Sequence, residues 1–123
     1  MMTGFITVDR EAAMRLIFKG VNGIEANLQV TVDTGFSEYV SLPQTWVDAL
    51  ALPFARYNDV TLADGSDIQA AVYEGIVVWD EQDKSVEVHC LEGDPLIGMS
   101  LLLEFLLTLP VRIGETFTVA SIP

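Results

Sequence analysis

The chain has 123 residues, of which 50% are hydrophobic and 20% are charged; this composition excludes a disordered chain and predicts one domain over residues 1–123 with a sizeable core. The 18 acidic and 6 basic residues leave a formal net charge of −12, which repels phosphate backbones and anionic lipid, so we expect neither nucleic acid nor a membrane as a partner. A single cysteine cannot form an internal disulfide, and residues 1–21 carry scattered charges with no apolar core of signal-peptide length, so we expect a cytoplasmic protein.

The first third of the chain predicts a short edge strand and then a hairpin. Residues 4–8 are β-prone, and residues 14–19 predict a longer strand. Val21-Asn22-Gly23 follows as a hairpin turn, because Asn-Gly tolerates positive φ. Residues 24–32 alternate apolar and polar side chains, which is the period of a strand with one buried face.

This alternating strand delivers one carboxylate into a turn. Asp33 continues the polar register, Thr34-Gly35 follows it, and Gly35 allows the backbone to turn sharply. Residues 39–42 predict the next strand, so Asp33 lies between two strands. By itself the triplet also fits an ordinary β-turn in which Asp33 bonds to its own loop.

A short helix and a long hairpin are predicted next. Pro43 suits the first turn of a helix that carries Trp46, Val47 and Leu50 on one face. Residues 59–63 and 68–79 predict the two arms of the hairpin. Its tip contains a favoured Asp-Gly turn and consists of Ala63, Asp64, Gly65 and Ser66.

The last third predicts a charged turn over residues 80–84, a strand and a helix. Residues 99–109 are apolar nearly all round, and Ser100, Glu104 and Thr108 form a single polar stripe at intervals of four, which predicts one buried helix. Residues 116–122 are β-prone. This order of elements predicts a mostly β chain folded as a closed barrel.

Two stretches resemble the signatures of the retropepsin-like aspartic proteases, in particular their small prokaryotic members. The first is Asp33-Thr34-Gly35-Phe36-Ser37 followed by Leu42-Pro43, and the second is Pro95-Leu96-Ile97-Gly98-Met99-Ser100-Leu101-Leu102. They occur in the family's order with a candidate flap between them, and the resemblance covers about residues 14–107. It implies a retropepsin-like closed β-barrel, the acid protease fold, with one buried C-terminal helix and one short helix.

The resemblance also implies roles for the matched residues. Asp33 matches the catalytic aspartate, Thr34 the threonine whose hydroxyl locks two active-site loops together across a dimer axis, and Gly35 the glycine that allows the loop geometry. Ile97 and Gly98 match the structural element that supports the catalytic loop. The substrate-binding flap tip, which closes over a bound peptide, matches Ala63, Asp64, Gly65 and Ser66.

Aspartic proteolysis needs two carboxylates that share one proton, whereas this chain has one Asp-Thr-Gly. Single-copy members of the resembling family obtain the second aspartate from an identical subunit. The leading hypothesis is therefore a homodimeric aspartic endopeptidase that cleaves a peptide or protein without a cofactor. We expect residues 4–8 and 116–122 to pair between the subunits, because each has the character of an exposed edge strand.

Three departures from the family pattern bear on activity. Phe36 replaces the small residue of retroviral members, the flap tip has one glycine, and Met99 replaces the polar residue that many relatives place after Gly98. One alternative is a dimerising or peptide-binding module of the same fold without turnover. Another is an unrelated small β-barrel with an incidental Asp-Thr-Gly turn.

Other catalytic chemistries have little support in the sequence. His89 and Cys90 are neighbours on a predicted strand, so their side chains point to opposite faces and do not converge. No second histidine or cysteine completes a zinc site, so we expect no metal. Ser37 and Ser66 have no histidine at a suitable position for a serine hydrolase.

Overall fold

A computed structural model describes all 123 residues and contains ten strands, two α-helices and one short 3-10 turn. The helices are α1 (Gln44–Ala49) and α2 (Met99–Leu102), and the 3-10 turn is Val21–Gly23. The strands are β1 (Met2–Ile6), β2 (Ala12–Lys19), β3 (Glu25–Val32), β4 (Val40–Leu42), β5 (Phe54–Thr61), β6 (Asp67–Trp79), β7 (Gln82–Cys90), β8 (Leu96–Ile97), β9 (Phe105–Thr108) and β10 (Thr116–Ser121). Neither helix is long and apolar enough to cross a membrane.

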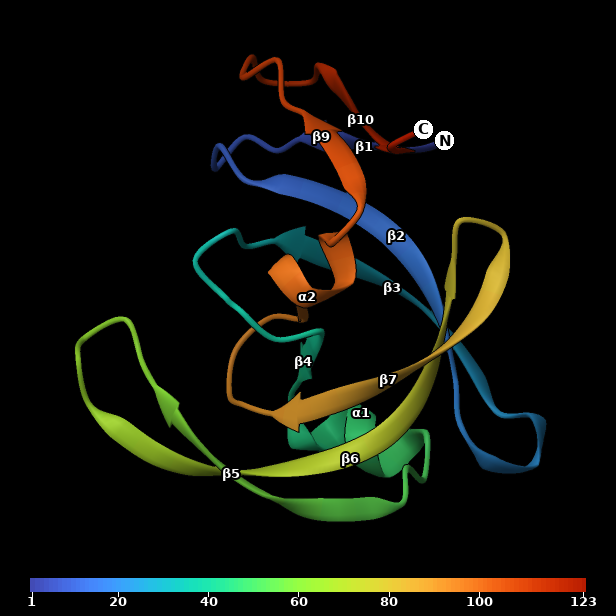
Figure 1. Ribbon diagram of the computed structural model, residues 1–123, viewed down its shortest axis with the longest axis vertical. Coiled ribbons are helices and arrows are strands. Elements are labelled where there is room, and N and C mark those ends of the chain that lie inside the picture. Colours follow the sequence, from blue (N-terminus) through green and yellow to red (C-terminus); the bar gives the residue numbers. More distant parts are fainter.

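All ten strands belong to one sheet, in the order β5-β6-β7-β4-β8-β3-β2-β1-β10-β9. β6 also pairs with β2, which closes the six strands from β6 to β2 into a ring (Figure 1). β5 continues the sheet beyond the ring on one side, and β1, β10 and β9 continue it on the other. The predicted mostly β, closed fold is confirmed.

The hairpin of β2 and β3 forms where the alternating pattern predicted it. Its strands are antiparallel from Ala13↔Thr31 to Lys19↔Glu25, and Asn22 and Gly23 both have positive φ in the turn. The apolar side chains of the pattern turn inward, so Leu28 and Val30 are buried. This alternation places the end of β3, and Asp33 directly after it, at the edge of the core.

One hydrophobic core extends from the ring to β1 and β10. It contains 20 buried side chains, including Phe18 of β2 and Phe117 of β10, and α1 adds Val47 with the adjacent Leu50. Burial of each such large side chain contributes about 1.5–3 kcal/mol to folding. Trp46, predicted on the same helical face, remains 36% exposed. The core therefore fixes the strand ends on which the candidate site depends.

The predicted buried helix over residues 99–109 is wrong in its extent. α2 ends at Leu102, Glu104 has a φ of 73°, and the chain then continues as β9, paired with β10. A polar stripe at intervals of four fits a strand as well as a helix, because four is a multiple of the strand period. In β9 the side chains of Phe105 and Leu107 pack on the core, whereas Leu106 is exposed.

The terminal strands also differ from their predicted arrangement. β1 is not an edge strand, because it pairs with β2 on one side and with β10 on the other. The pairing of β1 with β10 runs from Met2↔Val119 to Phe5↔Thr116 within one chain. The terminal strands β1 and β10 thus pair without a second subunit, and β9 is left as the outer strand at this end of the sheet, with β5 at the other end.

Candidate active site

Asp33 lies at the first position after β3, where the strand gives way to a loop. Its backbone N–H donates to the carbonyl of Ile97 at 2.9 Å, and its carboxylate accepts the N–H of Gly35 at 2.9 Å. A Cβ atom at residue 35 would lie 3.2 Å from that carboxylate oxygen, a tight contact that glycine avoids. The carboxylate is therefore held by its own turn, as the alternative β-turn interpretation also required.

The second signature lies directly against the first. β8 is inserted between β3 and β4, with Val32↔Ile97 in parallel pairing and Val40↔Ile97 in antiparallel pairing. Ile97 is fully buried in this position. The topology thus brings together Asp33 and Ile97, which are far apart in the sequence.

Gly98 allows the second signature to approach the loop that follows Asp33. A Cβ atom at this position would lie 2.4 Å from the carbonyl oxygens of both Phe36 and Glu38, so any larger residue would force the two segments apart. The N–H of Met99 then donates to the carbonyl of Phe36 at 2.8 Å. Gly98 consequently sets the distance between α2 and the Asp33 loop.

Ser100 is a residue of this site that the sequence interpretation missed. Its hydroxyl donates to the carbonyl of Ser37 at 2.6 Å, which ties α2 to the Asp33 loop through a side chain. The expected polar residue after Gly98 is therefore present one position later than Met99. Its signal in the sequence was a serine two positions after Gly98, at the start of the polar stripe.

A hollow of about 370 Å³ opens beside Asp33 and Thr34. Its walls include Arg10 and Glu11, in the turn between β1 and β2, and Leu109 and Val111, in the loop after β9. The Asp33 carboxylate is partly exposed and Thr34 is exposed. No residue of the predicted flap tip lines this hollow, so within one chain the tip does not cover Asp33.

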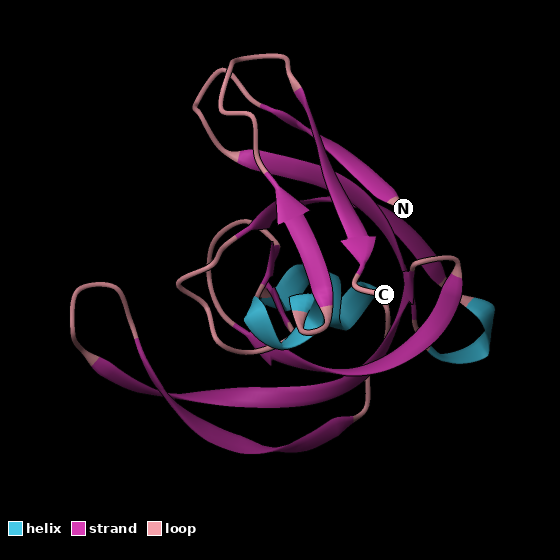
Figure 2. Ribbon diagram, turned by 45° about the horizontal axis from the view of Figure 1, so that its top comes forward, coloured by secondary structure: helices cyan, strands magenta, loops and turns pink.

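The hairpin of β5 and β6 carries the predicted tip. Both views show it projecting from the body on the same side as the loop between β3 and β4 (Figures 1 and 2). The Asp64 carboxylate accepts bonds from the hydroxyl and the N–H of Ser66 at 2.5 and 2.8 Å, and these bonds hold the pKa of Asp64 below its usual value, the hydroxyl bond most. Gly65 has a φ of 86°, which glycine adopts without strain.

Comparison with known proteins decides the fold. No protein-family model matches the sequence, and no curated protein matches it. A retropepsin-like aspartic protease from Rickettsia conorii superposes with a TM-score of 0.60 at 17% identity, over 98% of this chain and 91% of that one. EIAV protease in complex with the inhibitor HBY-793 superposes with a TM-score of 0.57 at 13% identity, over 77% of this chain and 88% of that one. The chain has the fold of the retropepsin-like aspartic proteases.

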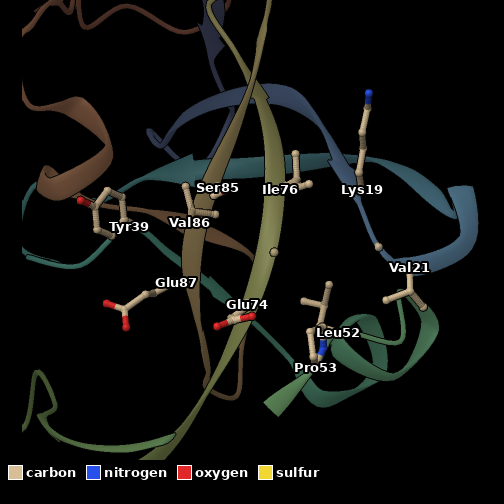
Figure 3. A pocket seen from close by; sticks show the side chains of 12 residues that line it. Lys19, Val21, Tyr39, Leu52, Pro53, Glu74, Ile76, Ser85, Val86 and Glu87 are labelled. Atoms are coloured by element: carbon tan, nitrogen blue, oxygen red, sulfur yellow. The ribbon is translucent and has the colours of Figure 1, made fainter. Parts of the chain in front are cut away.

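A cavity larger than the hollow at Asp33 lies elsewhere in this retropepsin-like fold. It has a volume of about 660 Å³ and lies at the base of the β5–β6 hairpin, between Val21, Tyr39 and Leu52 on one hand and the middle of β6 and β7 on the other. Glu74 and Glu87, a register pair of β6 and β7, lie side by side at it (Figure 3). None of its lining residues belongs to Asp33–Gly35 or to the flap tip, so this cavity is separate from the candidate site.

His89 and Cys90 do not form a pair in the retropepsin-like fold. The Cys90 thiol donates to the side-chain oxygen of Gln44 at 3.3 Å, and burial, helped by Asp48, raises its pKa. The His89 ring bonds instead to Asn58 at 3.0 Å. Their divergence is the strand alternation expected from the sequence.

We predict that His89 makes the stability of the fold pH-dependent. Burial lowers its pKa from the ordinary value of 6.5, and Arg56 adds to this, whereas Glu38 and Glu87 oppose it. The unfolded chain therefore takes up the proton first, so the stabilisation is complete above pH 6.5 and is lost as pH falls from there through the folded pKa. The melting temperature of the native chain should fall between about pH 7.5 and 5.5 more than that of His89→Leu; equal slopes would contradict the prediction.

Proposed function

We propose that the chain is an aspartic endopeptidase that acts as a homodimer and hydrolyses peptide bonds with a water activated between two Asp33 carboxylates, one from each subunit. The observation that carries this proposal is the position of Asp33. The chain's one Asp-Thr-Gly follows directly on β3, a strand of the ring, and Ile97, Gly98 and Ser100 contact the loop that holds it. Thr34 and Gly35 are exposed beside it and available to a second subunit.

The proposed chemistry requires one ionised and one protonated carboxyl group. The ionised carboxylate takes a proton from the water as the water oxygen attacks the carbonyl carbon, and the protonated carboxyl donates a hydrogen bond to the carbonyl oxygen. The tetrahedral intermediate then collapses, the C–N bond breaks, and the leaving amine takes up a proton from the carboxyl pair. These steps use no cofactor.

A second copy of the chain supplies what the single chain lacks. The hollow at Asp33 contains no second aspartate, and a two-fold axis presents the same residue from both sides. Beside this hollow, β9 and the segments on either side of it carry the exposed apolar side chains that we term the β9 patch: Leu103, Leu106, Leu109, Val111 and Ile113. β9 pairs with β10 on one side only, and an outer strand with one free edge and exposed apolar side chains is a surface suited to pairing with another strand.

A peptide-library cleavage assay across pH tests the proposal directly. The native chain should cleave a subset of peptides best at acidic to near-neutral pH, where the carboxyl pair holds one proton. The alternative is a peptide-binding module of the same fold. Saturable peptide binding without any cleaved product at any pH would replace the endopeptidase proposal with that alternative.

We predict that the flap tip closes over a bound ligand. Amide hydrogen exchange from Ala63 to Ser66 should be fast in the free protein, because these residues are exposed at the end of a projecting hairpin. A peptide inhibitor that mimics the tetrahedral intermediate should slow this exchange by about tenfold or more, since it adds contacts that only the closed flap makes. Unchanged exchange at a saturating inhibitor concentration would contradict a closing flap.

A further inference from the structure

His89 occupies an unusual position for a histidine without a metal or a catalytic partner. It has no exposed surface and lies on β7 opposite Val72 of β6 and Ser41 of β4. Its Nδ1 atom is buried and has no hydrogen-bond partner within the chain. An apolar side chain of similar size would fill this space without leaving a buried polar atom unpaired, so core packing alone does not account for a histidine here.

The one side-chain hydrogen bond of His89 reaches the hairpin that carries the flap tip. Its Nε2 atom lies 3.0 Å from the side-chain nitrogen of Asn58, which is on β5, the outer arm of the hairpin. β5 and β7 flank β6 on opposite sides, so the bond crosses the face of β6 between Ala70, opposite Asn58, and Val72, opposite His89. It therefore fastens the outer arm of the flap to a strand of the ring.

The imidazole ring of His89 also contacts the loop that carries Asp33. Phe36 meets His89 edge-on, with ring centroids 6.2 Å apart and planes at 88°. The N–H of Phe36 donates to the carbonyl of Asp33 at 3.1 Å. A continuous series of contacts thus runs from Asn58 on β5, through His89 on β7, to Phe36 in the Asp33 loop.

We propose that His89 is a positioning residue of the active site, which sets the position of the flap relative to Asp33 through its bond to Asn58 and its contact with Phe36. The inference rests on the proposed function, because a flap that must close over Asp33 is a requirement of that function. Phe36, a departure from the retroviral pattern, then has a structural purpose: its ring provides the contact surface for His89. Three charged groups lie around the His89 imidazole: Glu38 in the Asp33 loop, Glu87 on β7 and Arg56 on β5. Arg56 and Glu87 also form an ion pair with each other at 2.6 Å.

Hydrogen exchange in a double-mutant cycle tests this positioning role without any substrate. Asn58→Ala and His89→Leu should each speed amide exchange over residues 59–69 by about tenfold, the loss of one net hydrogen bond. The double variant should be no faster than either single variant, because both remove the same bond. Exchange in the β2–β3 hairpin should not change. Single variants without an effect on the flap, or effects that multiply in the double variant, would overturn the inference.

Two controls separate a positioning role from a general loss of stability. Asn27→Ala removes an asparagine on β3 that bonds Arg15 and should leave flap exchange unchanged. His89→Gln keeps a side chain able to bond Asn58 and should restore slow exchange in part; exchange as fast as in His89→Leu would count against the bond.

Activity provides a separate readout. In the active enzyme, Asn58→Ala should raise KM for a cleaved peptide by about five- to tenfold with a smaller change in kcat, because the flap would hold substrate less well. Repeating the exchange cycle in Asp33→Asn protein separates the two proposals. If no peptide is cleaved, the peptidase proposal fails and the exchange result still holds. If the exchange cycle fails, His89 has no positioning role and Asp33 can still be catalytic.

Discussion

Asp33→Asn is expected to abolish peptide cleavage, with a loss of at least about 1,000-fold in kcat/KM, within the range that positioned acid and base groups contribute. An amide can neither hold the shared proton nor take one from the attacking water. The fold should survive, because the asparagine side-chain oxygen can still accept the N–H of Gly35, which Asp33 accepts at 2.9 Å. Initial rates on a peptide that the native chain cleaves measure the loss, and circular dichroism and sedimentation check that structure and assembly are kept.

The matched control for this substitution is Asp83→Asn. Asp83 is an exposed aspartate at the start of β7, where it pairs with Lys19 at 3.1 Å, so its loss removes one charge without touching the Asp33 loop. It should retain nearly full activity. Cleavage by Asp33→Asn at the native rate would show that Asp33 is not catalytic.

The parts of the site that depend on local sequence pattern could be predicted. The alternation of residues 24–32 fixes which face of β3 is buried, and that determines where Asp33 emerges. The two turns with glycine, Asn22-Gly23 and Asp64-Gly65, were predicted because positive φ limits the choice of residue. In each case a short stretch carries the information, since the constraint acts between residues close in the chain.

The parts that depend on distant pairing could not be predicted. The apolar run after Gly98 suits both a helix and a strand, and only the pairing with β10 makes β9 a strand. The terminal segments, residues 4–8 and 116–122, were expected to pair between subunits, whereas β1 pairs with β10 within one chain. The bond of His89 to Asn58 links residues 31 positions apart, and nothing in the alternation of either strand indicates it.

Assembly should control activity, because one chain supplies one aspartate. Specific activity should fall on dilution below the dissociation constant of the dimer. Mixing equal amounts of native and Asp33→Asn chains should leave about a quarter of the dimers with two aspartates when the subunits exchange freely.

Thr34→Ala should weaken the dimer by about 1–3 kcal/mol if its exposed hydroxyl is buried against the partner loop. A monomer that is fully active at the assay concentration would contradict all three results.

Leu106→Glu should have a large effect on assembly, because Leu106 is an exposed residue within the outer strand β9, and a two-fold interface there would bring two carboxylates together. Like charges at the contact, added to a chain of net charge −12, should weaken the dimer about 100-fold or more and remove activity at concentrations where the native chain is active. Ile24→Glu is the matched control: Ile24 is also an exposed apolar residue, but it follows the hairpin turn at the end of β3 away from Asp33. Leu106→Glu should change both the sedimentation and the activity, whereas the control Ile24→Glu should change neither. If Leu106→Glu remains a fully active dimer, the subunits meet through another surface, and the β9 patch has no part in bringing the two Asp33 carboxylates together.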